Sequence, residues 1–283
     1  MITLASDFGS PYPAAMRGVL LRRTDARLVD VAHDFPRQDV RAAAFWLREV
    51  LPWFPPAVHL AVVDPGVGTD RAALVVRAGE HALVGPDNGL LLPAARRIAA
   101  ESPASPSPSA DETGDDADGG DDPDDAVEVF AYAYDNPDSA TFHGRDVFAP
   151  AAAEVHEAGV GALETLSAAT PAAEFVDLAF PEPTVREDDA TGRALAVDGE
   201  VLVVDDFGNA ITNVPGEVVR GRDAVVVNGE RVPVGESFAS VDAGERLVTV
   251  GSHGSVECDV NRGRGDEAFG LAPGDAVDIE LGR

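Results

Sequence analysis

The pattern of apolar residues changes near residue 184, and this change constrains the fold more than any other feature. Before it, short apolar runs alternate with longer segments of helical periodicity. That order predicts an α/β domain with a largely parallel sheet flanked by helices. After it, short runs of alternating polarity are separated by Gly, Asp and Asn, which predicts a smaller all-β barrel or sandwich domain. We therefore expect two domains, 1–183 and 184–283.

The expected elements follow from these runs and their flanking residues. In the first domain, strands are predicted at 1–6, 26–31, 58–63, 73–76, 81–84 and 127–134, with a Gly79 turn between the fourth and fifth. Helices are predicted at 13–22, 40–53, 90–100 and 148–158, with Asp39 as the N-cap of the second. In the second domain, strands are predicted at 195–204, 224–227, 230–234, 247–250, 255–260 and 276–281, without a helix.

Residues 101–125 interrupt the first domain with an acidic stretch of low complexity. It holds ten carboxylates and no cation, and is rich in Pro, Ser and Gly. Such a composition cannot bury enough apolar surface to offset the entropy of ordering, so we expect a disordered insertion. Its spacing matches no EF-hand loop, which argues against a calcium site.

The whole chain is strongly acidic. Its 283 residues include 50 Asp and Glu against 21 basic residues, all of them arginine, for a net charge of −29 at pH 7. Such a surface repels phosphates, which argues against a nucleic-acid partner. Screening in a salt-rich cytoplasm would weaken this self-repulsion, so a halophilic source is our hypothesis.

Three features predict a cytoplasmic protein. Cys258 is the single cysteine, so no intrachain disulfide forms; its alternating surroundings indicate a small buried thiol rather than a nucleophile. No apolar run approaches the roughly 20 residues of a membrane span, and we expect no membrane partner. The chain begins with a predicted strand rather than a signal peptide.

Two glycine-rich runs carry the candidate chemistry, and each follows a predicted strand. They are DPGVGTDR at 64–71 and TFHGRD at 141–146. Because open α/β sheets keep their chemistry at strand ends, Asp64, Arg71 and His143 can meet in one pocket. Together they would provide a general base, a fixed positive charge and an orienting acid. A structural salt bridge and a structural histidine are the alternatives.

Further polar loops are candidates for ligand binding. Asp7 follows the first strand, where a carboxylate accepts two hydrogen bonds from a diol such as ribose or simply caps a turn. The run DDFGNAITN at 205–213 has more polar side chains than an ordinary strand. Phe207 there can stack on a flat base and Asn209 can read its edge, unless the segment is only an asparagine-rich turn.

Common nucleotide, metal and hydrolase motifs are missing. GPDNGLL at 85–91 is not a phosphate-binding P-loop, which needs a lysine, and no G-x-G-x-x-G follows the first strand. The histidines show no paired ligand spacing, so no metal is expected. No G-x-S-x-G is present, which argues against a serine hydrolase.

Six ordered motifs resemble one known family. SDFG, DPGVGTDR, GPDNGLL, TFHGRD, DFGNAITN and SHGSVECDVNRG are similar to those of the S-adenosyl-L-methionine (SAM) hydroxide adenosyltransferases, the adenosine-forming SAM hydrolases. These are relatives of the SAM-dependent fluorinase and chlorinase. The resemblance implies a homotrimer that binds SAM where the N-terminal domain of one subunit meets the C-terminal domain of its neighbour. It also implies attack of water or hydroxide on the 5′ carbon, releasing adenosine and L-methionine without a cofactor.

The resemblance also implies roles for individual residues. The catalytic set would be Asp64, Arg71 and His143. The substrate-binding residues would be Asp7 at the ribose, Phe207 and Asn209 at the adenosine, Asp205 and Ser252 at the methionine end, and Asn88 and Phe142 in two further motifs. Which of Asp64 and His143 takes the proton is left open. If Arg71 keeps Asp64 ionised and lowers its basicity, His143 is the better acceptor.

Some residues depart from the family pattern. The SPYP loop at 10–13 is short and lacks a second aspartate, and His253 stands where a halogenase carries arginine. Halogenases place a tyrosine at the position of Asp64 and lack the equivalent of His143, so this chain favours water over halide. A non-catalytic SAM- or adenosine-binding protein and a SAM-dependent halogenase are the alternatives.

Overall fold

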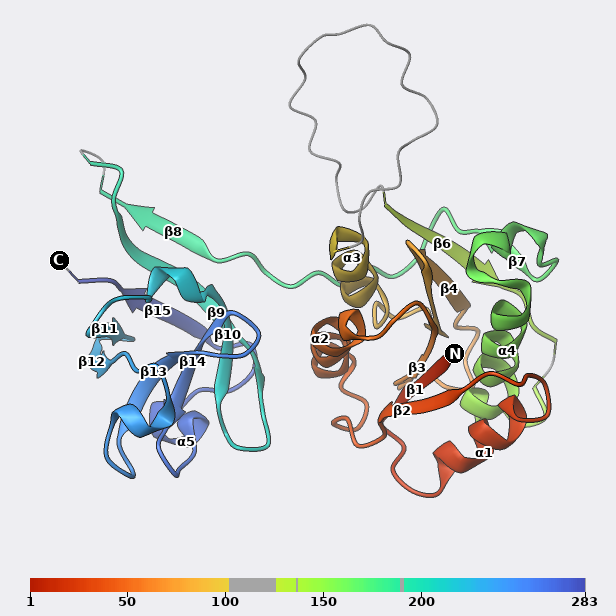
Figure 1. The fold of residues 1–283 in the computed structure, drawn as a ribbon, viewed down its shortest axis with the longest axis horizontal. Helices are drawn as coiled ribbons and strands as arrows, with labels where there is room; N and C mark the ends of the chain where they lie inside the picture. The colour runs from red at the N-terminus through yellow and green to blue at the C-terminus, as the bar shows by residue number, and fades with distance from the viewer. Residues whose placement is uncertain (102–125, 136, 189–190, 283) are drawn as a thin grey trace, which may run out of the picture. The chain divides into compact units, whose positions relative to one another are not determined.

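The computed structural model describes residues 1–101, 126–135, 137–188 and 191–282. The expected disordered insertion therefore lies outside the described residues, apart from Glu101. The chain forms two units, Met1–Ala179 and Phe180–Arg283, each built around its own sheet (Figure 1). In the described part of the chain, no helix has the length and apolar character needed to cross a membrane.

The N-terminal sheet has seven strands in the order β2-β1-β3-β5-β4-β6-β7. Their bounds are β1 Ile2–Ser6, β2 Leu28–Ala32, β3 Val58–Val62, β4 Ala73–Ala78, β5 His81–Pro86, β6 Val127–Tyr132 and β7 Ala169–Pro171. The β1, β2, β3 and β5 strands pair in parallel, whereas β4 pairs antiparallel with β5 and β6, and β6 with β7. The sheet is thus mixed, and the prediction of a largely parallel sheet was only partly correct.

The reason lies in the connection between β4 and β5. A turn at Gly79, which has a φ of 56°, joins them directly. A connection this short can only reverse the chain, because parallel neighbours need a crossover of a dozen or more residues. The Gly79 turn identified in the sequence therefore already implied an antiparallel pair.

Helices cover both faces of this sheet (Figure 1). They are α1 Tyr12–Leu20, α2 Val40–Val50, α3 Leu92–Glu101 and α4 Ala149–Ala158, with 3₁₀ turns at Leu51–Trp53 and Val160–Thr165 and a π-helical turn at Gly144–Phe148. The α1 helix packs beside α4, and α2 packs beside α3. Asp39 caps α2 as expected, because its Oδ1 accepts a hydrogen bond from the Ala42 amide at 2.9 Å.

The C-terminal unit contains an antiparallel sheet in the order β12-β11-β15-β9-β10-β14-β13, with β8 also paired to β9. The bounds are β8 Thr184–Glu187, β9 Ala194–Val204, β10 Ala210–Pro215, β11 Ala224–Val227, β12 Glu230–Pro233, β13 Arg246–Val250, β14 Ser255–Val260 and β15 Ala276–Glu280. A bridge between Val234 and Val248 joins the two ends of the sheet, which makes it barrel-like. The all-β prediction is confirmed except for the five-residue helix α5, Gly265–Phe269, and short 3₁₀ turns at Gly216–Val218 and Phe238–Ser240.

The interior of this unit is formed mainly by valines that alternate along the strands. Val256 and Cys258 of β14 belong to this interior, with Cys258 fully buried. Burial raises the pKa of the Cys258 thiol to about 12, so the thiol stays protonated at neutral pH. This confirms the expectation of a buried structural thiol.

Candidate active site

Two neighbouring strands of the N-terminal sheet end in aspartates. Asp7 directly follows β1 and Asp64 follows β3, and these strands run in parallel with Ser6 opposite Val62. Both carboxylates are buried or half-buried. Asp7 Oδ2 accepts a hydrogen bond from the Gln38 amide at 2.7 Å, which ties it to the loop before α2.

The loop after β3 brings Arg71 back to Asp64, as the spacing in the sequence indicated. Arg71 Nε lies 3.1 Å from Asp64 Oδ1, and the same oxygen accepts a hydrogen bond from the Gly66 amide at 3.0 Å. A second donor of the guanidinium, Nη1, reaches the Asp87 carbonyl oxygen at 3.0 Å. The side chain of Arg71 is therefore held between the loop and the end of β5.

The pKa of Asp64 is raised, and burial is the largest cause. The Gly66 amide, the Arg71 guanidinium and His143 each lower the pKa of Asp64, while Asp7 raises it further. Arg71 thus lowers the basicity of Asp64, as the sequence indicated, but the net pKa of this carboxyl still lies above its ordinary value. Desolvation outweighs the charge pair because only 4% of the Asp64 side chain is exposed.

A cavity of about 480 Å³ opens beside Asp64. His143 and Phe142 line it, together with Arg145 of the same TFHGRD run and with Tyr12 and Arg37, which were not candidates from the sequence. Its size lies within the range of small-molecule sites. The structure thus brings Asp64, Phe142 and His143 to one cavity, and Arg71 joins them through Asp64.

Aromatic rings form one wall of this cavity. The Phe142 ring meets Phe8 and Tyr12 edge to face, with centroids 5.8 and 5.5 Å apart. Gly144 permits this packing, because a Cβ there would lie 3.0 Å from both Phe8 and the Met16 sulfur. His143 directly precedes this glycine and the π-helical turn that begins there, and it lines the cavity.

Asn88 has both ends of its side chain engaged in the loop before α3. Its Nδ2 donates to the Val63 carbonyl oxygen at 2.8 Å, and its Oδ1 accepts from the Leu90 amide at 3.2 Å. The contact with Val63 ties Asn88 to the residue that directly precedes Asp64. A direct contact of Asn88 with substrate stays a prediction.

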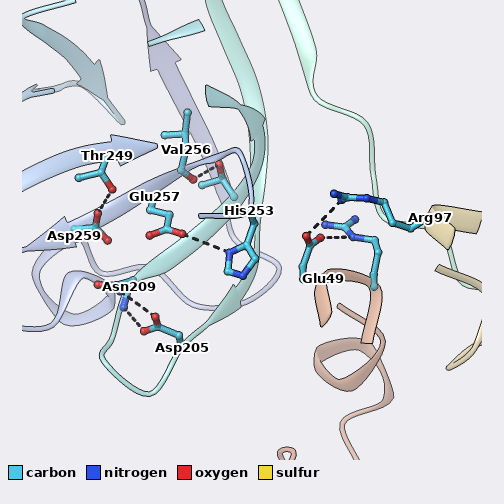
Figure 2. Close-up of polar contacts among 11 residues, drawn as sticks. Glu49, Arg97, Asp205, Asn209, Thr249, His253, Val256, Glu257 and Asp259 are labelled. Carbon is cyan, nitrogen blue, oxygen red and sulfur yellow. Dashed lines mark hydrogen bonds and ion pairs between the residues drawn. The ribbon is translucent and has the colours of Figure 1, made fainter. Parts of the chain in front are cut away.

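Three of the candidate binding residues in the C-terminal unit, Asp205, Phe207 and Asn209, lie in one loop between β9 and β10. Figure 2 shows Asp205 and Asn209 of this loop. Asp205 Oδ1 accepts from the amides of Phe207 and Asn209, each at 2.9 Å, and its Oδ2 accepts from Asn209 Nδ2 at 2.9 Å. The Asp205 carboxylate thereby fixes the loop, while the Phe207 ring stays 80% exposed. An aromatic ring held this way offers a surface on which a base can stack.

Ser252 lies elsewhere on the same unit, in the turn between β13 and β14. The β10 and β14 strands are antiparallel, with Ala210 opposite Cys258 and Pro215 opposite Ser255. The Ser252 turn and the 205–209 loop therefore flank opposite ends of this strand pair. Ser252 is exposed, and its neighbour His253 has Nδ1 3.8 Å from Glu257 Oε1.

Two buried acids of β14 were not anticipated from the sequence (Figure 2). Glu257 and Asp259 alternate with the core residues of β14, and this alternation within VECDV was the signal that could have found them. Asp259 is fully buried, accepts a 2.6 Å hydrogen bond from Thr249, and has a second oxygen without a partner among the described residues. Burial is the main cause that raises the pKa of Asp259 to about 7.

Both units match known protein families. The SAM hydroxide adenosyltransferase N-terminal domain matches residues 2–166, and the SAM hydroxide adenosyltransferase C-terminal domain matches residues 199–278. The chain belongs to the SAM hydroxide adenosyltransferase family. The resemblance stated from the six motifs is therefore confirmed.

Relatives of known name match this family member over almost its whole length. A (R)-S-adenosyl-L-methionine hydrolase from Salinispora tropica is 39% identical over 99% of this chain and 98% of its own. One from Thermus thermophilus is 42% identical over 95% of each chain. Among solved structures, an uncharacterized conserved protein from Thermotoga maritima has a TM-score of 0.75 at 29% identity and 99% coverage of both chains. A conserved hypothetical protein from Thermus thermophilus has a TM-score of 0.69 at 35% identity and 98% coverage of both chains.

Proposed function

We propose that this protein hydrolyses SAM to adenosine and L-methionine by attack of water on the 5′ carbon. The observation that carries this proposal is the difference between the two carboxylate oxygens of Asp64 beside the cavity. Its Oδ1 contacts the Gly66 amide and the Arg71 guanidinium, whereas no described residue donates a hydrogen bond to its Oδ2. This oxygen is available to a water molecule in the cavity. The names of the relatives, (R)-SAM hydrolases, support the same substrate.

The chemistry needs few groups. The bond between water oxygen and the 5′ carbon forms while the carbon–sulfur bond breaks, and its electron pair returns to sulfur as a neutral thioether. No acid is needed to expel such a leaving group, so the protein must position the water and accept its proton. We assign the proton to Asp64, because burial raises the pKa of this carboxyl, and the orientation of the water to His143 on the same cavity wall.

The remaining contacts extend this proposal to the whole substrate. Asp7 would bind the ribose hydroxyls, and the exposed Phe207 ring and Asn209 the adenine. Asp205 and Ser252 would bind the methionine end, each from its own end of the β10 and β14 strand pair. These candidate residues are divided between the two units of the chain. We further propose a cytoplasmic homotrimer in which a neighbouring subunit completes each site. Light scattering tests the trimer, with an expected mass of three times 29.4 kDa.

Chromatography after incubation with SAM tests the function. Adenosine and methionine should appear in equal amounts, and separate incubations with the two sulfonium epimers should show a preference for the (R) form. Asp64→Asn is the matched variant, since it keeps the shape of the side chain and removes its charge. Folded wild-type protein that binds SAM without releasing adenosine would contradict the proposal and indicate a binding protein.

The same assay in molar chloride distinguishes hydrolysis from halogenation. A buried carboxylate at Asp64 repels a halide at the attacking position. We therefore expect adenosine to stay the product. Formation of 5′-chloro-5′-deoxyadenosine would instead identify a halogenase.

A further inference from the structure

One arginine on the cavity wall has no acidic partner among the described residues. Arg37 and Arg145 both line the cavity. Arg145 is neutralised by Asp146, whose two oxygens accept from Nε and Nη2 at 2.5 and 2.7 Å. Arg37 is exposed, and no hydrogen bond or ion pair joins its guanidinium to another residue of the described chain. A free guanidinium is notable at the cavity of a protein in which acids outnumber arginines 50 to 21.

The backbone on both sides of Arg37 is fixed to the loop after β1. The Gly9 amide donates to the His33 carbonyl oxygen at 2.7 Å, and the Gln38 amide donates to Asp7 Oδ2 at 2.7 Å. A Cβ on Gly9 would lie 3.6 Å from Arg37 Nη2, so the guanidinium passes close to this loop. The backbone that carries Arg37 is therefore held beside the cavity, and its exposed side chain can meet a ligand there.

The candidate binding segments of the C-terminal unit are rich in acids. Asp205, Glu257 and Asp259 are carboxyl groups on or beside the β10 and β14 strands (Figure 2). The arginine that contacts the 205–209 loop, Arg264, is held by Asp266 at 3.0 and 2.7 Å. Glu257 and Asp259 are buried and Asp205 is engaged by its own loop, so these carboxyl groups form no exposed acidic surface, but a carboxylate of SAM placed beside them would be disfavoured.

We propose that Arg37 binds the α-carboxylate of the substrate and so selects amino-acid sulfonium compounds over those that lack the acid. The inference rests on the proposed function, because SAM supplies the carboxylate. Arginine suits this role, since its planar guanidinium donates two parallel hydrogen bonds to one carboxylate. The carboxylate is the only acidic group of SAM, and Arg37 is the cavity cation left without an acid among the described residues.

Two substrates and four proteins test the proposal. SAM and decarboxylated SAM, which lacks only the carboxylate, are compared with the wild type, Arg37→Gln, Arg37→Lys and the control Arg22→Gln. Arg22 is an exposed arginine that follows α1, away from the residues that line the cavity. Steady-state adenosine release gives kcat and KM for each combination.

We expect Arg37→Gln to lower kcat/KM for SAM about 10- to 100-fold and to leave decarboxylated SAM within about twofold of the wild type. The loss should appear in KM, because the carboxylate does not change during the reaction. Arg37→Lys should recover part of the loss, and Arg22→Gln should match the wild type. An equal loss on both substrates, or no loss on SAM, would overturn the role of Arg37.

A failure of the proposed function is separable from a failure of this inference. If the wild type releases no adenosine, the proposed function fails by itself. Equilibrium dialysis with both compounds then tests Arg37 without turnover. If Arg37→Gln weakens the binding of SAM but not that of decarboxylated SAM, the carboxylate contact is supported. Unchanged binding of SAM overturns it.

Discussion

At the scale of single residues, the position of Arg71 depends on a neighbour without a side chain. A Cβ on Gly66 would lie 2.3 Å from Arg71 Nη2 and 2.6 Å from Nε. Gly66→Ala must therefore displace the guanidinium from Asp64, and we expect kcat for SAM hydrolysis to fall about 100-fold. Gly18→Ala in α1 is the control, because its Cβ would meet no atom within 4 Å. Full activity of a folded Gly66→Ala protein would show that Arg71 is not needed.

Asp64 should also determine the pH dependence of hydrolysis. Its carboxylate form accepts the proton, so kcat/KM should fall as the pH drops through its pKa. Because burial raises this pKa, the acid limb should lie above the ordinary value of 3.8. Asp64→Asn should remove the limb and lower kcat about 10²- to 10⁴-fold. A pH–rate profile measures both, and an acid limb at or below pH 3.8 would contradict the assignment.

At the scale of elements, a buried histidine pair connects three strands of the N-terminal sheet. Thr3 Oγ1 lies 2.8 Å from His59 Nδ1, and His59 Nε2 lies 2.9 Å from His81 Nδ1. Burial lowers the pKa of His59 to about 3 and also lowers that of His81. The unfolded chain therefore binds protons below pH 6.5 that the folded chain does not, and stability present above pH 6.5 is lost as the pH falls.

This loss can be measured by urea unfolding at about pH 7 and about pH 5. For His59 alone, we expect the free energy of unfolding to fall by about 2 kcal/mol over this interval. The variant His59→Gln lacks this titration, so its stability should change less between the two pH values. An identical pH dependence of the wild type and the variant would rule out His59 as the source.

The same scale shows what could be predicted from the sequence. For strands and helices with clear apolar periodicity, the predicted bounds lie within a few residues of the observed ones. The β10 strand was missed because polar residues dominate its surroundings, and its buried Thr212 is satisfied by a 2.7 Å hydrogen bond to the Val256 carbonyl oxygen. The α5 helix depends on tertiary packing, since a Cβ on Gly265 would lie 2.0 Å from the Cys258 carbonyl oxygen.

The candidate site also contains residues that were predictable from the sequence and residues that were not. The contact between Asp64 and Arg71 was predictable, because one short loop of fixed spacing joins them. Arg37 was not predictable, because it lies in a loop without a motif. Hydrogen bonds of Gly9 and Asp7 to that loop bring it to the cavity. Side chains that reach a site through long-range backbone contacts leave no local pattern in the sequence.

At the scale of the whole molecule, the net charge of −29 should make stability depend on salt. Repulsion among carboxylates is screened as the Debye length falls from about 10 Å at 0.1 M salt to about 3 Å at 1 M. We therefore expect the free energy of unfolding in urea to rise between about 0.1 and about 2 M KCl. Deletion of 102–125 removes nine acids and no cation and changes the net charge to −20, so the rise should shrink by about a third. Unfolding that is independent of KCl would contradict the hypothesis of a halophilic protein.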